Sequence, residues 1–184
     1  MANQTAGFGF RQAPTVGSTP ATGGQAEYMV KSGLGVGIFQ NNPVSQQHTA
    51  GDDGYLQDAA AATMDDGITG GAGWSTATSN IQPIVGVFNG IFYNDATTKK
   101  PTFANFYNQP ITPANSEDVT CFVIDNPLQL FAGCMDAAAA QAEYGKTYSF
   151  AAAVPTGSEI SGQCTNKLDY ANRHITNNQW RLLR

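Results

Sequence analysis

The residues with the most reactive side chains are few and stand in polar surroundings. The 184-residue chain has two histidines, His48 within Gln-Gln-His-Thr and His174 within Asn-Arg-His-Ile. No Gly-x-Ser-x-Gly turn presents a serine nucleophile, and no glycine loop ends in Gly-Lys-Ser or Gly-Lys-Thr to hold a phosphate. The glycine-rich run 33–37 is followed by Ile38, so the dinucleotide-binding pattern fails. We therefore predict no catalytic residue and no cofactor.

Two pairs of carboxylates, Asp52-Asp53 and Asp65-Asp66, lie in glycine-containing turns. Carboxylate oxygens are ligands that Ca²⁺ accepts, but neither pair has the spacing of an EF-hand loop. In a solvated turn an aspartate bonds its own backbone, and the sequence favours this interpretation. A small hydrolase with its catalytic carboxylates among these four residues remains an alternative.

The three cysteines, Cys121, Cys134 and Cys164, are spaced 13 and 30 positions apart. An odd number at such intervals matches neither a disulfide framework nor the short ligand spacing of zinc sites. We predict buried thiols that pack as small apolar side chains, and no metal site.

The composition narrows the classes of function. Charged residues make up 12% of the chain and the net charge is −5, so a nucleic-acid partner is not expected. No apolar run has the length of a membrane span, which predicts no membrane partner. No secretory pattern is visible at the N-terminus, so we expect the chain to fold in a cytosol.

Short apolar runs separated by Gly, Asn-Pro and Asp-Asn turns indicate β-strands. In the longest run, 84–93, Asn89-Gly90 predicts a tight hairpin, with a single long strand carrying a glycine bulge as the alternative. Apolar residues alternate onto both faces of a strand at 119–124, so we expect both faces to be covered in a two-layer core. Further strands are predicted at 28–30, 35–39, 128–131, 147–154 and 180–183.

One short helix is predicted over 137–144, with Asp136 as its N-cap and Gly145 as its left-handed end. Residues 45–80 are mostly polar or tiny, which predicts a long surface loop. The fold class that follows is mainly β: a compact β-barrel or two-layer β domain with one short helix and an extended N-terminal arm.

The predicted arm covers residues 1–26 and the β-rich domain covers residues 27–184. The arm is poor in aliphatic residues, and its large side chains are Phe8, Phe10 and Arg11. These aromatic rings either become ordered on a partner surface or pack on the chain's own domain. On the first alternative, removing residues 1–12 leaves the β domain folded but weakens partner binding.

Several short patterns together resemble a known family. The opening Met1-Ala2-Asn3 is followed by Phe8-Gly9-Phe10, then by the blocks 38–44, 85–93 and 123–127, an Ala-rich segment with Gly145, and Leu168-Asp169. In this order they resemble head-decoration (cement) proteins of tailed bacteriophages, of the marine and cyanobacterial type.

The resemblance implies a non-enzymatic β-rich virion protein made in the host cytoplasm. Such a protein binds the outer surface of the capsid and stabilises the shell by bridging major capsid protein subunits. It implies self-association as a homo-trimer or dimer, and it assigns Phe8, Phe10 and Arg11 to the capsid interface. The alternative within the binding class is a phage tail, fibre or host-adhesion subunit.

Overall fold

The computed structural model describes residues 7–17, 20–21, 23–47, 54–59, 84–108, 110–150, 157–171, 173 and 180–183. Over this part of the chain the fold is mainly β, its named strands pair antiparallel, and no helix reaches seven residues. The predicted fold class, a compact β domain, is confirmed, and the sheet does not close into a barrel. The elements are β1 Phe10–Gln12, β2 Ala26–Val30, β3 Pro43–Gln46, β4 Leu56–Asp58, β5 Ile84–Asn94, β6 Pro101–Ala104, the 3₁₀ turn η1 Ala114–Ser116, β7 Val119–Ile124, β8 Phe131–Gly133, the 3₁₀ turn η2 Gln141–Glu143, β9 Thr147–Tyr148 and β10 Trp180–Arg181.

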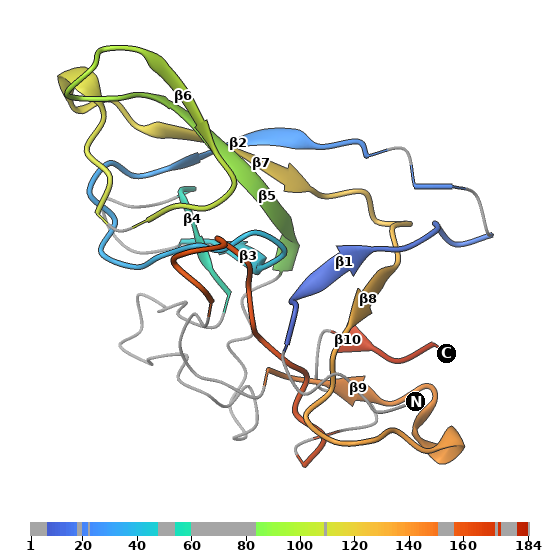
Figure 1. The fold of residues 1–184 in the computed structure, drawn as a ribbon. Coiled ribbons are helices and arrows are strands. Elements are labelled where there is room, and N and C mark those ends of the chain that lie inside the picture. The colour runs from blue at the N-terminus through green and yellow to red at the C-terminus, as the bar shows by residue number, and fades with distance from the viewer. Residues whose placement is uncertain are drawn as a thin grey trace.

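The strands form one large sheet and two small ones (Figure 1). The order in the large sheet is β2-β7-β5-β3-β4, and β6 pairs with the far end of β5. The small sheets join β1 to β8 and β9 to β10. In Figure 1 the small sheets lie together, apart from β2, β7 and β6. Strands β1 and β10, which are far apart in the chain, therefore lie in one region, where Phe10 stacks on Trp180.

The long strand β5 is continuous from Ile84 to Asn94, so the alternative with a bulge is confirmed and the hairpin prediction is wrong. Its register against β7 shifts between Phe88 and Gly90. In a regular strand Phe88 and Ile91 would face opposite sides, because side chains alternate. The extra residue at the bulge brings both into the same core. Gly90 has φ +145°, a conformation that glycine adopts without strain.

Two hydrophobic cores share β5. Its residues Phe88 and Ile91 lie in the first core, on the inner face of the large sheet, while Val87 lies in the second core on the other face. The first core consists of Val30, Ile38, Val44, Leu56, Phe88, Ile91, Tyr107, Val119, Cys121 and Val123. The second core consists of Phe10, Ala59, Val87, Tyr148, Phe150 and Leu168.

The second core covers only one end of the large sheet. Val87 is buried there and pairs in register with Ile124, which is also buried. Further along the same face of β7, Thr120 and Phe122 are only half-buried. The prediction that both faces of β7 are covered therefore holds at Ile124 and fails at the other end of the strand.

The helix predicted over 137–144 is wrong, because the structure has only the 3₁₀ turn η2 in this stretch. Asp136 does not act as an N-cap; its Oδ1 accepts a hydrogen bond from the backbone N–H of Tyr170 at 2.8 Å. Isolated helices of this length are marginal, so tertiary contacts override an Ala-rich sequence. Gly145 does have a positive φ, +84°, as predicted.

The first part of the long loop predicted over residues 45–80 contains strand residues instead. Ser45 and Gln46 belong to β3, and Leu56–Asp58 form β4, whose three residues are all buried. Residues 60–83 and both aspartate pairs lie outside the described residues. The predicted strand at 35–39 is wrong; in its place Ile38 forms an isolated bridge with Tyr107.

Candidate protein-binding surface

The N-terminal aromatic residues have different environments. Phe10 is 2% exposed, and its ring stacks on Trp180 with centroids 4.3 Å apart. For Phe10 the alternative of packing on the chain's own domain is therefore correct. Phe8 is half-buried, and the exposed Arg11 places its guanidinium 4.7 Å from the Phe8 ring centroid. Of the three predicted interface residues, Phe8 and Arg11 remain accessible and Phe10 does not.

The predicted arm is also shorter than residues 1–26. β1 pairs with β8, and beyond it Ala13 and Val16 donate backbone hydrogen bonds to Leu130 and Leu128, each at 2.9 Å. Residues 10–16 are thus part of the domain. The premise that residues 1–12 can be removed without loss of the fold is contradicted, because they supply a core side chain and a strand.

Several of the exposed large hydrophobic side chains among the described residues lie together on the outer face of the large sheet. We call this group of side chains the apolar face and define it as Met29, Phe92, Phe103 and Phe122. The first three are 41%, 43% and 62% exposed, and Phe122 is half-buried. The rings of Phe103 and Phe122 lie 6.2 Å apart. Exposed apolar side chains that cluster in this way are candidates for an interaction site.

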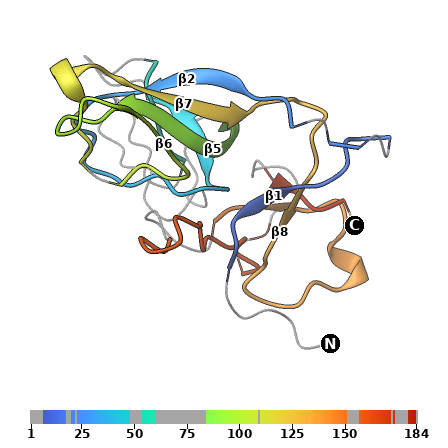
Figure 2. The same cartoon turned by 45° about the horizontal axis from the view of Figure 1, so that its top comes forward.

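Strand register explains why these residues form one surface. Phe92 lies opposite Phe103 of β6 on one side and opposite Thr120 of β7 on the other. Thr120 in turn lies opposite Met29 of β2. Residues directly opposite each other in antiparallel strands have neighbouring side chains on the same face. Four strands therefore contribute one row, and β2, β7 and β5 lie side by side in Figure 2.

The sequence interpretation missed this face because it did not predict β6. A signal was present in the turn before it, where Asp95 Oδ1 accepts hydrogen bonds from the N–H groups of Thr97 and Thr98 at 2.9 and 2.7 Å. These bonds lower the pKa of the Asp95 carboxyl. An aspartate that bonds the backbone two residues on is a turn signal. Placed between two aromatic runs, it indicates a hairpin.

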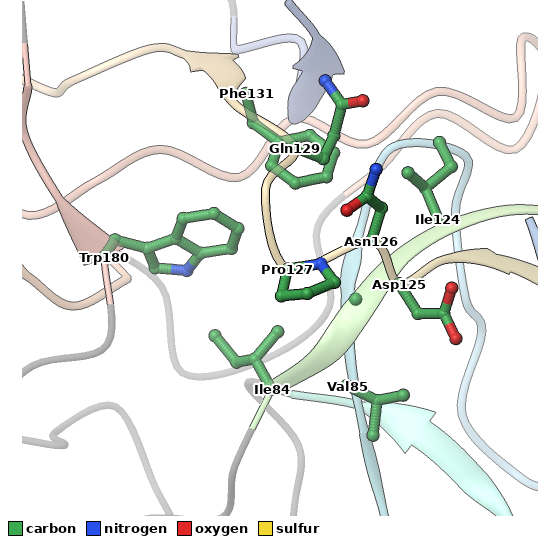
Figure 3. Close-up of a pocket in the computed structure, with 10 residues that line it drawn as sticks. Ile84, Val85, Ile124, Asp125, Asn126, Pro127, Gln129, Phe131 and Trp180 are labelled. Carbon is green, nitrogen blue, oxygen red and sulfur yellow. The ribbon is translucent and has the colours of Figure 1, made fainter. Parts of the chain in front are cut away.

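A groove of about 220 Å³ opens where β7 leaves β5 (Figure 3). Its apolar walls come from Ile84, Ile124, Pro127, Phe131 and Trp180. Trp180 is held between two rings, because it stacks on Phe10 and meets Phe131 edge-on at 5.8 Å. The groove therefore has at least one rigid wall.

The cysteine prediction is confirmed for two of the three thiols. None of the three forms a disulfide, and Cys121 and Cys164 are buried while Cys134 is half-buried. Burial raises the pKa of the Cys121 and Cys164 thiols to about 12, so both stay protonated near neutral pH. The Cys164 thiol also donates to Asn42 Oδ1 at 2.9 Å.

One buried carboxylate, Glu143, is surrounded by donors. Its Oε2 lies 2.9 Å from Arg173 Nε and 3.1 Å from Lys146 Nζ, and it accepts a hydrogen bond from the Tyr148 hydroxyl at 3.2 Å. Burial by itself raises the pKa of Glu143, but the hydrogen bonds from Lys146 and Tyr148 and the charge of Arg173 outweigh it, so the pKa is lowered. The cluster connects two stretches of the chain, residues 143–148 and Arg173.

The remaining candidates for chemistry, two histidines and the four paired aspartates, lie outside the described residues: His48, His174, Asp52, Asp53, Asp65 and Asp66. Within the described ranges, no group of three or more His, Cys, Asp or Glu side chains is arranged to hold a metal ion. In the same ranges, no helix has the length and apolarity needed to cross a membrane.

Comparisons with family models, curated proteins and solved structures found no match to this chain.

Proposed function

We propose that this chain is a non-enzymatic structural protein of a tailed-bacteriophage virion. It binds the outer surface of the capsid and stabilises the shell by bridging major capsid protein subunits. The observation that carries the proposal is the apolar face, where Met29, Phe92 and Phe103 are each more than 40% exposed on one row of the sheet. The order of short sequence patterns supports the choice of a capsid as the partner.

The size of the apolar face fits a contact that works in many copies. With about 150–250 Å² per phenylalanine side chain, the exposed parts of Phe92 and Phe103 amount to about 200 Å². Burying that area contributes about 5 kcal/mol, which is near the low end of the cost of association. A single copy therefore binds weakly. On a capsid lattice, contacts to neighbouring subunits raise the effective concentration of each bound copy, so individually weak contacts are sufficient for stable binding.

The experiment is co-sedimentation of the purified chain with expanded, undecorated capsids of its source phage. Bound copies are counted per major capsid protein subunit as the chain is titrated. We expect saturation at a small integer ratio, since each lattice position offers one equivalent site. A handful of copies per particle would instead favour the tail or adhesion alternative.

The double variant Phe92→Ser/Phe103→Ser tests the apolar face itself. Both side chains are exposed, so the fold should be retained while capsid occupancy at a fixed concentration falls at least about tenfold. Val16→Ser is the matched control, because Val16 is 56% exposed on a different segment. Equal binding by the double variant and the wild-type chain would remove the apolar face from the proposal.

A further inference from the structure

The outer side of β6 is an unpaired edge of the large sheet. β6 pairs with β5, and among the described residues no other strand pairs with it. In Figure 2 β2, β7, β5 and β6 follow one another across the sheet. An open strand edge presents a row of backbone N–H and C=O groups to which a further strand can bind. The edge of β6 is therefore a candidate for pairing with a strand of another chain.

The hairpin between β5 and β6 shows which backbone groups face that edge. The Asp95 N–H donates to the Lys100 carbonyl at 3.0 Å, so these two residues form a hydrogen-bonded pair. Hydrogen-bonded and non-hydrogen-bonded pairs alternate along an antiparallel ladder. Phe92 and Phe103, three positions further along in the observed register, are thus a non-hydrogen-bonded pair. Both backbone groups of Phe103 therefore point away from β5, toward the free edge.

Phe103 carries the one outward backbone donor of β6. By the same alternation the backbone of Pro101 also faces the free edge, but proline has no N–H. The outward acceptors are the carbonyls of Pro101 and Phe103. Within the described ranges these outward groups have no hydrogen-bond partner, and the Phe103 side chain beside them is 62% exposed. A donor and an acceptor are thus available on the same residue.

We propose that the β6 strands of two copies of this chain pair antiparallel about a two-fold axis that passes between their Phe103 residues. In this register the Phe103 N–H of each copy donates to the Phe103 carbonyl of the other. One alternation further out, the Asn105 N–H of each copy donates to the Pro101 carbonyl of the other. Pro101 lacks only the donor of the reciprocal bond.

The distribution of donors selects a second copy and this register. The strand that binds must place an acceptor opposite the single donor of β6, and the Phe103 carbonyl of a second copy does so by symmetry. In the neighbouring register, which places Phe103 opposite Pro101, the Phe103 carbonyl would face a residue without an N–H. The two-fold register through Phe103 is therefore the one in which both outward groups of Phe103 are used.

The side chains favour the same arrangement. Residues directly opposite each other across paired strands lie on one face, so the two Phe103 rings become neighbours and cover part of each other's exposed surface. The apolar faces of the two copies then lie on the same side of one continuous sheet. Pairing at the edge leaves these faces open, so it is compatible with the proposed capsid contact and does not depend on it.

A matched pair of variants at one position tests the backbone contact. Phe103→Pro removes the outward donor, and proline is tolerated on the free side of an edge strand. Phe103→Ala is the control, because it removes the ring and keeps the N–H. Circular dichroism confirms the fold, and sedimentation equilibrium measures the mass over a range of concentrations. A contact between two four-residue strands is small, so we expect a wild-type dissociation constant of about 10 µM to 1 mM.

The outcomes separate the edge from the ring. We expect Phe103→Pro to have a dissociation constant at least about tenfold higher than that of Phe103→Ala. Equal association of the two variants would contradict the hydrogen-bonded register. A wild-type chain that stays monomeric up to about 1 mM, or that forms a trimer as its largest species, would overturn the proposal.

A variant that should strengthen the dimer does not depend on a disruptive change. Pro101→Ala supplies an N–H opposite the Asn105 carbonyl of the partner copy, which adds one hydrogen bond on each side of the axis. We expect its dissociation constant to be at least about fivefold lower than that of the wild type. Pro110→Ala, at an exposed position outside β6, is the matched control. A Pro101 variant that associates no more tightly than this control would contradict the register.

Hydrogen exchange measured by NMR reports on the edge directly. The Phe103 amide hydrogen should exchange rapidly in dilute protein and more slowly as the concentration rises, along the same curve as the mass. The Thr102 amide, which faces β5, is the internal reference and should not follow that curve. Dimer formation without slower exchange at Phe103 would place the contact elsewhere and overturn the proposal. These measurements use no capsids, so their failure is distinguishable from failure of the proposed function.

Discussion

At the scale of single residues, the N-terminal aromatic pair shows how one position decides between core and surface. Phe8 and Phe10 stand on either side of Gly9, which has a positive φ of +68°. Gly9 also packs closely against Asn41 and Cys164, because a Cβ at this position would lie within 3.0 Å of their atoms. The chain turns Phe10 into the second core and leaves Phe8 half-buried beside Arg11. The same residue type therefore has two roles.

Replacing Phe10 with alanine should destabilise the domain by about 3–5 kcal/mol, because it removes a fully buried ring and leaves a cavity beside Trp180. Urea unfolding followed by circular dichroism measures the change. Phe8→Ala is the control and should cost clearly less, since Phe8 keeps solvent contact. Equal losses for the two variants would contradict the assignment of Phe10 to the core.

At the scale of elements, the bulge in β5 is the feature on which the apolar face depends. It places Phe88 and Ile91 together in the first core and leaves Phe92 on the outer face opposite Phe103. Without the extra residue, Phe88 and Ile91 could not both lie in the first core, because a shift of one residue moves every following side chain to the other face of the sheet. An Asn-Gly pair therefore serves here as a bulge inside a strand.

Gly90→Ala tests the bulge. A Cβ at this position would lie 2.9 Å from the Ala104 carbonyl oxygen and 2.9 Å from the Phe103 ring, and φ is +145°. We expect a loss of about 1–3 kcal/mol in the free energy of unfolding. Gly35→Ala is the matched control, because nothing lies within 4 Å of its Cβ position. A Gly90 variant as stable as this control would show that the bulge tolerates a side chain.

At the scale of the whole molecule, the two cores are joined by β5, which contributes Phe88 and Ile91 to the first and Val87 to the second. Beside the second core, the Glu143 cluster connects the segment 143–148 to Arg173, because it holds Lys146, Tyr148 and Arg173 around a single carboxylate. The adjacent backbone continues the connection, with Gly145 donating to the Leu182 carbonyl at 2.8 Å. The C-terminal strand, and with it Trp180, is therefore anchored next to this cluster.

The lowered pKa of Glu143 predicts a dependence of stability on pH. A carboxyl whose pKa is lower in the folded state stabilises the fold above its unfolded pKa, about 4.3, and loses that stabilisation as the pH falls through the folded pKa. Glu143→Gln should lower the thermal midpoint at neutral pH and flatten its decline below about pH 4.3. Glu117→Gln, which removes a carboxylate at an exposed position, is the matched control. A wild-type profile in the Glu143 variant would be contrary to this expectation.

The sequence by itself determined the class of fold and several of its strands. Residues 119–124 form β7 within the predicted bounds, and the run 84–93 is a strand, because β-branched and aromatic residues bounded by turn residues favour extended backbone wherever they pack. The prediction that the cysteines are buried holds for Cys121 and Cys164 and fails for Cys134. These features depend on local chemistry.

Only the tertiary structure decided which surfaces are covered. Phe10 and Phe92 look alike in the sequence, yet one is buried under Trp180 and the other is exposed beside Phe103, because coverage depends on strands distant in the chain. The groove likewise exists only where β7 departs from β5 and β10 approaches. Local patterns specify strands, whereas the faces left free for partners depend on how those strands pack together.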